Sequence, residues 1–570
     1  RKFTCFIRKE YTTVNMFYNT LEKNLKNNYS QYVIEDNKKY SFHSLYQMVE
    51  QKYKIIESQN IRQNVIVYMS STIECLSTIL ALWKANKTYI PINITTPSNR
   101  VNYIKDTLQD YSEININKNG KSLFSSKITS EEIPSTNVAY IIFTSGTTGK
   151  PKGVQITYDN LNSLFKGLGK KFNFCKDNTW INLHSLEFDF SIWEILAPLY
   201  YKNNLVLLGN NVKIYEFDKI SQLIVDKQVT ILNQTPSAFF SLMKFFESSN
   251  ISAKNINTII FGGEKLDYTN LLPIYSKFSN INFYNLYGIT EVTIHATFHK
   301  ITDKDFTKVN GSTVSNIGKG IFGNNVFLKK VSNSKYSEIV VKGPTISEGY
   351  INNPEETNKR FIDDTSDNLY LSGDLGEYLP SGDINYIGRK DQQIELNGYR
   401  IELDDIRENI LKSNKNFDEV FIIRFQNKLA TFYMTQNNTT LDIEQVKEKL
   451  NYLLPTYMIP SYFYQITKIP LTTNGKIDTH YLTQLLEEKL INQKKDTENL
   501  TEFEKWLVNK FHLDITNFHD VSFTEIGLTS MELINLHDEL LNNFILKKEI
   551  SIVDFFQYNT IKSFEDEFIK

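Results

Sequence analysis

The stretch Tyr140-Ile-Ile-Phe-Thr-Ser-Gly-Thr-Thr-Gly-Lys-Pro-Lys-Gly-Val154 decides the fold class of this chain. The β-branched and aromatic residues from Val138 to Phe143 predict a buried strand. Glycines and small hydroxyl residues follow it, and their backbone N–H and side-chain O–H groups can surround a phosphate. The spacing is not that of the P-loop NTPases, because the glycines lie too close together and a proline follows Lys150. An ordinary surface turn is the alternative, but it would not explain a strand that runs directly into such a loop.

The composition argues for a large globular protein and against two classes of partner. At 570 residues the chain can form a large core plus one or two smaller domains. Lys and Arg total 63 and Asp and Glu total 65, so the charge favours neither nucleic acid nor an anionic membrane as a partner. No apolar run approaches the roughly 20 residues that a membrane helix needs. Cys5, Cys75 and Cys175 lack metal-ligand spacing, which is typical of a reducing compartment, so we expect a cytoplasmic protein.

Strands and helices alternate from Val138 to about Asn385, which predicts a layered α/β architecture. Three expected strands end in polar corners, at Asn233–Pro236, Gly262–Glu264 and Leu286–Glu291. Ligands bind beyond the carboxyl ends of strands in open α/β sheets, so these corners and the loop after Phe143 are expected to share one cleft. We expect strands at Asn64–Met69, Leu205–Leu208, Val229–Leu232, Thr258–Phe261 and Ile281–Tyr284, and helices at Val14–Leu25 and Ile73–Ala85.

The sequence predicts four consecutive parts. Residues 1–390 are expected to form a large layered α/β core, and residues 391–489 a small α+β subdomain. The polar residues 490–500 form a linker, and residues 501–570 form an all-α four-helix domain. Because the chain opens at Arg1 rather than Met, we expect a piece excised from a longer polypeptide. The small subdomain is expected to contain strands Gln393–Leu396 and Val420–Arg424 and helices Asp404–Lys412 and Asp442–Leu453, and the apolar faces of the last domain are expected at Phe503, Trp506, Leu507 and Phe511 and at Leu533, Ile534, Leu536, Leu540 and Leu541.

Four motifs resemble the signatures of adenylate-forming enzymes: the loop 144–153, Tyr287-Gly-Ile-Thr-Glu291, Tyr370-Leu-Ser-Gly-Asp374 and Asn474-Gly-Lys-Ile-Asp478. The resemblance implies that the chain activates a carboxylate with ATP and Mg²⁺. Tyr287 would stack on adenine, Glu291 would bind Mg²⁺, and Asp374 would accept hydrogen bonds from the ribose hydroxyls. It assigns ATP binding to Thr144, Ser145, Gly146, Thr147, Thr148, Gly149, Lys152, Gly263, Tyr287, Asp374 and Arg389.

The same resemblance implies a rotation of the small subdomain. Lys476 falls on the catalytic lysine of the family and would complete a catalytic set with Thr290 and Glu291, because positive charge at the reacting oxygen lowers the barrier. Asp391 falls on the hinge of the rotation. In one orientation Lys476 reaches the site and the adenylate forms. After rotation the loop Glu395–Glu402 would line the site and a thiol could enter.

The substrate is indicated by Phe188-Asp-Phe-Ser-Ile-Trp-Glu194, which resembles the motif of amino-acid-activating members. There Asp189 would pair with the α-ammonium of the substrate. A buried structural aspartate is the alternative, although burying an unpaired carboxylate is costly. Asn233 and His295 would add hydrogen-bonding groups to an apolar pocket, a pattern that resembles threonine-activating domains, so we expect L-threonine, with serine or another small hydroxy amino acid as second choice. The resemblance places the pocket at Asp189, Phe190, Trp193, Asn233, Ile260, Gly262, Leu286, Ile294, His295 and Lys476.

The stretch Phe523–Leu533 resembles the attachment site of peptidyl carrier domains, and Ser530 would carry 4′-phosphopantetheine at a helix N-terminus. A plain N-cap serine is the alternative. The whole chain resembles an adenylation–carrier didomain of a nonribosomal peptide synthetase. This implies as partners an amino acid, other synthetase domains such as condensation or thioesterase, a phosphopantetheinyl transferase and a small MbtH-like activator protein. Two alternatives stay open, an acyl-CoA or aryl-CoA ligase of the same fold and a catalytically silent scaffold that only presents the carrier.

Overall fold

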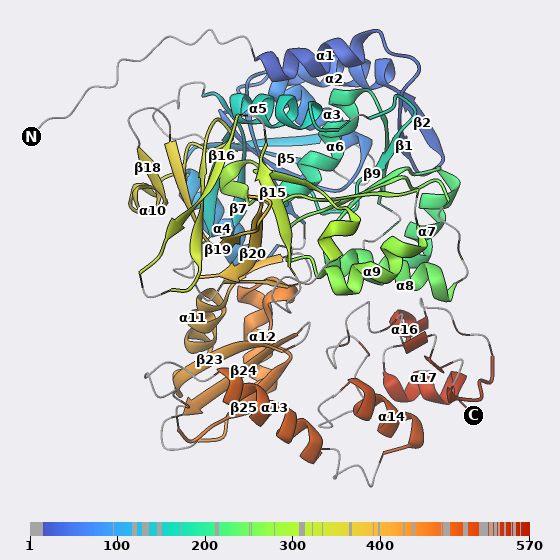
Figure 1. Cartoon of the computed structure of the whole chain (residues 1–570), viewed down its shortest axis with the longest axis vertical. Coiled ribbons are helices and arrows are strands. Elements are labelled where there is room, and N and C mark those ends of the chain that lie inside the picture. The colour runs from blue at the N-terminus through green and yellow to red at the C-terminus, as the bar shows by residue number, and fades with distance from the viewer. Residues whose placement is uncertain are drawn as a thin grey trace, which may run out of the picture.

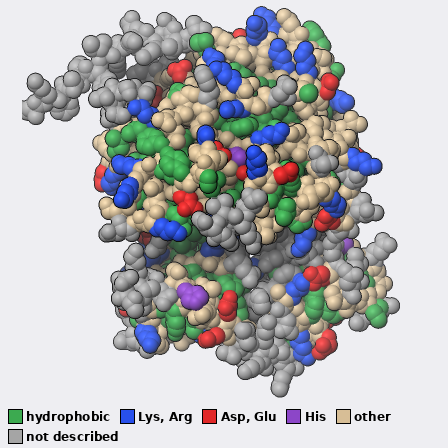
Figure 2. Space-filling view, in the orientation of Figure 1, with side chains coloured by type: hydrophobic (Ala, Val, Ile, Leu, Met, Phe, Trp, Pro, Cys, Tyr) green, Lys and Arg blue, Asp and Glu red, His purple; other side chains and the backbone are tan. Residues whose placement is uncertain are grey.

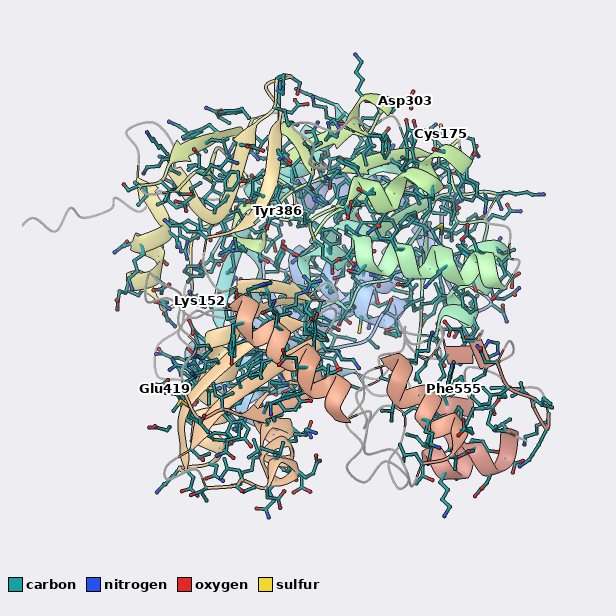
Figure 3. The ribbon with its side chains drawn as sticks, turned by 60° about the horizontal axis from the view of Figure 1, so that its bottom comes forward. Lys152, Cys175, Asp303, Tyr386, Glu419 and Phe555 are labelled. Atoms are coloured by element: carbon teal, nitrogen blue, oxygen red, sulfur yellow. The ribbon has the colours of Figure 1, made fainter. Side chains whose placement is uncertain are left out.

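The computed structural model describes residues 15–570 apart from 95, 117–121, 128–135, 145–150, 173, 211, 213–215, 250, 252–253, 279, 307–313, 322, 333, 364–367, 391–392, 397–398, 426–427, 436–438, 469, 471–478, 494–499, 512–522, 524–527, 529–532, 534–535, 538, 541–542, 549, 551–553, 559 and 570. Figure 1 shows a large upper lobe, with the small subdomain and the C-terminal helices below it. Figure 3 labels Lys152 and Tyr386 in the large lobe, Glu419 in the small subdomain and Phe555 in the C-terminal unit.

One sheet of the large lobe contains the strand that precedes the glycine-rich loop. Strand β7 (Val138–Thr144) is buried over its first five residues, as its β-branched and aromatic composition predicts. It runs parallel to β4 and antiparallel to β8, so the loop between β7 and β8 turns at the carboxyl end of β7. The sheet has the order β6-β5-β3-β4-β7-β8 and comprises β3 (Asn64–Met69), β4 (Thr88–Asn93), β5 (Tyr111–Ile116), β6 (Ser122–Lys127), β7 and β8 (Lys152–Thr157).

The larger sheet carries the three polar corners. Strands β11 (Ile231–Gln234), β12 (Thr258–Phe261) and β13 (Asn282–Asn285) are parallel neighbours in register, so their corners lie side by side. The corners therefore share one edge of the sheet, as the sequence predicts. The remaining strands of this sheet are β1 (Tyr32–Glu35), β2 (Lys38–Ser41), β9 (Thr179–Ile181), β10 (Asn204–Leu207), β14 (Thr297–Lys300), β15 (Asn316–Gly320), β16 (Asn325–Lys330), β17 (Ser337–Lys342), β18 (Phe361–Asp363), β19 (Asn368–Tyr378) and β20 (Ile384–Arg389).

Helices fill the space between the two sheets and cover the outer face of the larger one. Helices α3, α5 and α6 share one buried cluster with strands of both sheets, whereas α7, α8 and α9 pack on the other face of β11–β13. Because side chains alternate along a strand, Ile231 and Asn233 face the α6 side of β11 and Leu232 faces α8. The helices of the lobe are α1 (Met16–Lys26), α2 (Phe42–Glu57), α3 (Ile73–Lys84), α4 (Ser98–Leu108), α5 (Tyr158–Gly169), α6 (Asp189–Tyr201), α7 (Phe217–Asp226), α8 (Pro236–Ser248), α9 (Tyr268–Lys277) and α10 (Pro354–Arg360), with a 3₁₀ turn η1 (Thr290–Val292).

The small subdomain packs against the large lobe through α12 and α4. Asn99 Nδ2 donates to the Leu453 carbonyl over 3.3 Å, and the centres of the Phe188 and Tyr399 rings lie 4.9 Å apart. The subdomain mixes helices with a three-stranded sheet in the order β23-β24-β25, which agrees with the expected α+β composition. Its elements are β21 (Gln393–Leu396), β22 (Tyr399–Glu402), α11 (Leu403–Ser413), β23 (Phe417–Phe425), β24 (Lys428–Thr435), α12 (Ile443–Leu453), β25 (Tyr462–Gln465) and α13 (Thr479–Gln493).

The predicted linker, residues 490–500, begins before the preceding helix ends. Helix α13 continues to Gln493, and Leu490 is buried in the same cluster as Leu482 and Leu486. The i, i+4 spacing of these leucines keeps them on one helix face, so the first four residues of the range 490–500 belong to the helix of the small subdomain.

The C-terminal unit contains α14 (Glu502–Phe511), α16 (Asp554–Gln557) and α17 (Ile561–Phe568). Phe503, Leu507, Leu533, Leu536 and Leu540 are buried in one apolar cluster, as the expected helix faces require. Most of residues 512–535 lie outside the described part of the chain, so the four-helix carrier domain stays a prediction.

The outer surface agrees with the balanced charge of the sequence. Figure 2 shows Lys and Arg side chains interspersed with Asp and Glu over the face in view. None of the helices in the described part of the chain has both the length and the apolar character needed to span a bilayer.

Candidate active site

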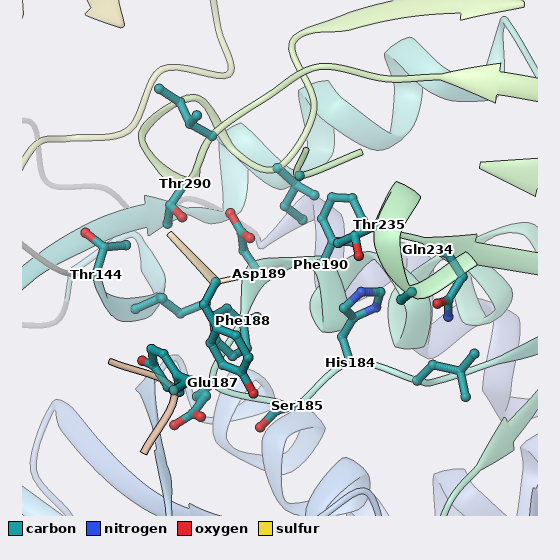
Figure 4. Close-up of a pocket in the computed structure, with 18 of the residues that line it drawn as sticks. Thr144, His184, Ser185, Glu187, Phe188, Asp189, Phe190, Gln234, Thr235 and Thr290 are labelled. Atoms are coloured by element: carbon teal, nitrogen blue, oxygen red, sulfur yellow. The ribbon is translucent and has the colours of Figure 1, made fainter. Parts of the chain in front are cut away.

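A cavity of about 200 Å³ lies at the strand ends of the large lobe, and the small subdomain contributes part of its wall. Figure 4 shows Thr144 and Thr290 together at one side of it, Asp189 in the middle, and His184 and Gln234 toward the other side. The cavity thus joins the end of β7, the start of α6 and all three predicted corners. Its described lining comprises Arg100, Ile142, Phe143, Thr144, Leu183, His184, Ser185, Glu187, Phe188, Asp189, Phe190, Ile220, Gln234, Thr235, Ala238, Leu242, Gly263, Gly288, Ile289, Thr290, Ile294, Tyr399 and Tyr457.

Three residues expected to hold adenosine form one hydrogen-bonded group. Tyr287 Oη donates to Asp374 Oδ2 over 2.6 Å, and Arg389 Nη1 donates to Asp374 Oδ1 over 2.9 Å. The pairing of β19 with β20 places Asp374 opposite Arg389. Burial, and then the nearby Asp374 carboxylate, raise the pKa of Tyr287 well above its usual value, so its hydroxyl stays protonated and acts as a donor. The arrangement offers a ring, a carboxylate and a guanidinium in one place.

Glu291, the predicted metal ligand, lies in η1 directly after Thr290. Its side chain is buried, and its Oε1 accepts a hydrogen bond of 2.9 Å from Tyr350 Oη. A carboxylate of this kind suits Mg²⁺, which takes oxygen ligands and commonly combines one or two carboxylates with phosphate oxygens. Among the described residues, no cluster of three or more His, Cys, Asp or Glu could hold a metal by itself. The donor set therefore fits a metal that is bound together with a nucleotide.

Lys152, expected to bind ATP, does not line the cavity. Its Nζ lies 2.8 Å from Glu356 Oε2 on α10 and 5.5 Å from the centre of the Tyr350 ring. Burial alone would raise the pKa of Glu356, but hydrogen bonds from Lys152 and Lys359 lower it to about 2. The Lys152 side chain therefore ties β8 to α10 and contacts the tyrosine that donates to Glu291.

The residues expected to bind the amino acid converge on the start of α6. Asp189 is the first residue of this helix and lines the cavity, and Phe190, which follows it, packs its ring into the space left by Gly262. A Cβ on Gly262 would lie 2.4 Å from Phe190 Cζ, so the wall requires a glycine there. The apolar residues of the expected pocket share one buried cluster: Phe190, Trp193, Ile260, Leu286 and Ile294.

Three buried polar side chains in this region have unmet hydrogen-bonding capacity. Both amide atoms of Asn233, both ring nitrogens of His295 and Trp193 Nε1 lack a hydrogen-bond partner among the described residues. The His295 ring centre lies 5.4 Å from that of Trp193 and 5.4 Å from that of Phe190. Burial lowers the pKa of His295 to about 3, so the imidazole is neutral and can donate at one nitrogen and accept at the other. Such groups are normally satisfied, so their presence indicates a polar ligand or ordered water at this spot.

Several predicted residues lie outside the described part of the chain. These are the loop residues Ser145, Gly146, Thr147, Thr148 and Gly149, the hinge Asp391, the lysine Lys476 and the attachment residue Ser530. Their roles stay predictions.

The cavity wall also contains residues that sequence reasoning did not place in the site. His184 lies on the loop between β9 and α6, four residues before the Phe188–Glu194 segment, while Arg100 and Tyr457 come from distant parts of the chain. The Tyr457 ring stacks on Tyr399 with centres 3.7 Å apart. Tyr399 belongs to the loop that the resemblance assigns to the second orientation, so the sequence carried a signal for it. Nothing local to Tyr457 indicates a site.

Comparison with known proteins agrees with this geometry. Residues 105–351 match the family model described as AMP-binding enzyme. The chain is 30% identical over 484 residues to gramicidin S synthase 1 of Brevibacillus brevis, covering 79% of this chain and 43% of that protein. It is 28% identical over 489 residues to a dimodular nonribosomal peptide synthase of Bacillus subtilis (strain 168), covering 78% of this chain and 20% of that protein. The chain thus spans less than half the length of either synthetase.

The fold has a counterpart among solved structures. Holo-PA1221, described as a nonribosomal peptide synthetase protein containing adenylation and PCP domains bound to a vinylsulfonamide inhibitor, superposes with a TM-score of 0.77 at 19% identity and covers 96% of this chain and 95% of its own. The cavity, the matched family model and these relatives define the chain as an adenylate-forming enzyme of the AMP-binding family. Its relatives at 28–30% identity are nonribosomal peptide synthetases, and its fold is similar to that of a protein described as containing adenylation and PCP domains.

Proposed function

We propose that this protein activates L-threonine with ATP and transfers the threonyl group to a phosphopantetheine thiol on its own Ser530. The observation that carries the choice of amino acid is the set of unsatisfied polar atoms on Asn233, His295 and Trp193 near the start of α6. A buried polar group without a partner costs about 1–3 kcal/mol, and a ligand that supplies the missing hydrogen bonds recovers this. The ligand should therefore combine a small apolar body with a hydroxyl group.

In the first half-reaction, the bound ATP and amino acid would extend across the cavity. Thr144 and Thr290 would donate to the phosphates, and Tyr287, Asp374 and Arg389 would hold the adenosine. The Asp374 oxygens already accept protein hydrogen bonds, and a carboxylate has further lone pairs that the ribose hydroxyls could use. A carboxylate oxygen of the substrate attacks the α-phosphorus, and pyrophosphate leaves.

Two groups would neutralise the charge that develops in this step. Glu291 would hold Mg²⁺ beside the phosphate oxygens, and the metal would supply Lewis-acid stabilisation when bound. Lys476 would bring its ammonium to the reacting oxygen, where preorganised charge lowers the barrier most.

Asp189 would hold the other end of the amino acid. Its carboxylate would lie opposite the α-ammonium of the substrate, because it lines the cavity between the side with Thr144 and Thr290 and the apolar walls. An ion pair in this position would orient the substrate carboxylate toward the phosphates.

The size and polarity of the pocket support threonine over larger amino acids. Phe190 lines the cavity, Trp193 is buried with it in one apolar cluster, and the Phe190 ring fills the space beside Gly262. The neutral His295 and the Asn233 amide could each donate to or accept from a hydroxyl. A site built to bond a hydroxyl rejects analogues that lack one, because its own polar groups then stay unpaired. Serine, which keeps the hydroxyl and loses the methyl, is the second choice.

The second half-reaction would transfer the threonyl group to the thiol of phosphopantetheine on Ser530. This part of the proposal is supported by the sequence around Ser530, by the buried helical cluster of the C-terminal unit, and by the likeness in fold to a protein described as containing adenylation and PCP domains. Other synthetase domains would then take the threonyl group onward. A phosphopantetheinyl transferase would be needed to load Ser530, and a small MbtH-like protein is a candidate activator.

Amino-acid-dependent ATP–pyrophosphate exchange tests the first half of the proposal. The purified chain is assayed with each of the common amino acids at equal concentration. Threonine should give the highest rate, followed by serine. A best substrate with an aromatic or charged side chain would refute the assignment of the pocket. If none of the amino acids supports exchange, the proposed activity is refuted.

Intact-mass measurement tests the second half. Treatment with a phosphopantetheinyl transferase and coenzyme A should add one phosphopantetheine to the wild-type chain and none to Ser530→Ala. Addition of ATP and threonine should then add one threonyl group to the loaded wild-type chain. Loading of the Ser530→Ala variant would contradict the proposed attachment site.

A further inference from the structure

A histidine–carboxylate pair lies in the cavity wall, and the proposed function leaves it without a role. His184 Nδ1 and Glu194 Oε1 are 2.7 Å apart. His184 lines the cavity, whereas Glu194, on α6, is fully buried behind it. The His184 ring packs edge to face against Phe190, with the ring centres 5.1 Å apart, so its position is fixed from two sides.

The surroundings of Glu194 fix the tautomer of His184. Glu194 Oε2 accepts hydrogen bonds from Asn182 Nδ2 over 2.8 Å and from the backbone N–H groups of Leu183 and His184 over 3.0 Å each. An oxygen that accepts three hydrogen bonds belongs to an ionised carboxylate, so Oε1 is an acceptor as well. In the neutral imidazole, His184 therefore donates from Nδ1 and its Nε2 carries the lone pair. A carboxylate that orients an imidazole in this way is a recurring arrangement for a general base.

Among the described groups of the cavity wall, His184 is the imidazole, the side chain most often used as a general base. The other charged or titratable members of the wall among the described residues are Arg100, Glu187, Asp189, Tyr399 and Tyr457. Asp189 is assigned to the substrate ammonium. Burial raises the pKa of Glu187, while Arg100 opposes this rise, and burial also raises the pKa of Tyr399 and Tyr457. The parts of α7 and α8 that line this side are apolar, at Ile220, Ala238 and Leu242.

We propose that His184 is the general base of the thioester-forming step, acting through Nε2 on the incoming thiol. The inference rests on the proposed function, since it needs an aminoacyl adenylate in the cavity. The S–H bond breaks as its proton passes to Nε2, and the thiolate attacks the carbonyl carbon. The C–S bond forms, the bond from carbonyl carbon to the phosphate oxygen breaks, and AMP leaves with that electron pair. The imidazolium then returns its proton to water.

The expected size of the effect follows from thiol ionisation. A thiol with the pKa of cysteine, about 8.5, is only about 3% thiolate at pH 7. A base that deprotonates the thiol during attack removes this limit. The rate of thioester formation should then rise about 30-fold at pH 7 and about 4-fold at pH 8. The benefit should vanish at higher pH, where the free thiol ionises unaided.

The experiment compares two nucleophiles on the whole chain before phosphopantetheine loading. Protein, ATP and the preferred amino acid are mixed with either free pantetheine, to form a thioester, or hydroxylamine, to form a hydroxamate. Hydroxylamine is already a neutral nucleophile near pH 7 and needs no deprotonation before attack. The ratio of thioester rate to hydroxamate rate is measured at pH 7, 8 and 9 for the wild type, His184→Gln and the control His299→Gln. His299 pairs with Asp305 over 2.8 Å and does not line the cavity.

The proposal predicts that His184→Gln lowers this ratio about 30-fold at pH 7 and about 4-fold at pH 8, with near wild-type values at pH 9. His299→Gln should keep the wild-type ratio throughout. An unchanged ratio in His184→Gln at pH 7 would overturn the proposal, and so would a loss of equal size at all three pH values, which a structural role would give. Wild-type protein that forms no hydroxamate would instead refute the proposed function itself.

Discussion

Asn233→Leu should make the ligand-free protein more stable and less active. Asn233 is 1% exposed on β11, and neither its Nδ2 nor its Oδ1 has a hydrogen-bond partner among the described residues. Leaving a buried amide unpaired costs about 1–3 kcal/mol, and leucine has a similar shape without polar atoms. The substitution should therefore raise the free energy of unfolding of the large lobe by about 1–2 kcal/mol.

Asn182→Leu is the matched control, because Asn182 is equally buried and fully paired. Its Nδ2 donates to Glu194 Oε2 and to the His184 carbonyl, and its Oδ1 accepts from Ser71 Oγ over 2.6 Å. Removing this amide leaves those partners unsatisfied, so the same chemical change should lower stability by about 2 kcal/mol or more. The two asparagines thus differ in the sign of the expected effect.

Urea unfolding followed by tryptophan fluorescence measures both variants, because Trp180 and Trp193 are buried in this lobe. The midpoint should rise for Asn233→Leu and fall for Asn182→Leu at an unchanged slope. In ATP–pyrophosphate exchange, Asn233→Leu should lower the ratio of the rate with threonine to the rate with valine about tenfold. A fall in stability for Asn233→Leu comparable to that of the control would refute the inference that a ligand completes this site.

Three further changes have definite expected outcomes. Asp189→Asn removes the charge that we propose pairs with the substrate ammonium, and it should lower kcat/KM for the amino acid in exchange about 10- to 100-fold, with little change in the KM for ATP. An equal loss for ATP would contradict this assignment. Gly288→Ala would place a Cβ 2.0 Å from the Ile294 carbonyl oxygen and 2.6 Å from His295 Cα. It should therefore lower the urea midpoint by the equivalent of about 3 kcal/mol. Wild-type stability would contradict this and show that the loop can move. Burial raises the pKa of Asp405 from 3.8 to about 6, with Arg100 opposing, so the folded state binds this proton more tightly than the unfolded state. The free energy of unfolding should therefore fall as pH rises from 4 to 6. Asp405→Asn should remove that part of the pH dependence, and an unchanged profile would contradict this account.

Much of the fold follows from local patterns in the sequence. The sequence predicts the bounds of β3, β7, β12 and β21 to within a residue, because the pattern of apolar residues along a strand can be read locally. The three polar corners were expected to meet because parallel neighbours end at the same edge. The helical start of the expected linker was missed even though Leu482, Leu486 and Leu490 repeat every four residues.

The parts of the site that sequence reasoning missed depend on contacts between distant segments. Tyr457 reaches the cavity from the small subdomain, and Lys152 finds its partner Glu356 some two hundred residues away. No local pattern encodes such pairings, since they follow from how the sheets and the subdomain pack. His184 is different, because it lies close to the Phe188–Glu194 segment, but its pairing with Glu194 depends on the turn between β9 and α6.

The most direct test asks whether the cavity recognises an ammonium group and a hydroxyl group on one small molecule. ATP–pyrophosphate exchange with L-threonine, L-2-aminobutyrate and 3-hydroxybutyrate separates the two features, because each analogue lacks one of them. We predict that threonine supports exchange at least about tenfold faster than either analogue. Equal rates with 3-hydroxybutyrate would contradict the role of Asp189, and equal rates with 2-aminobutyrate would contradict the role of Asn233 and His295.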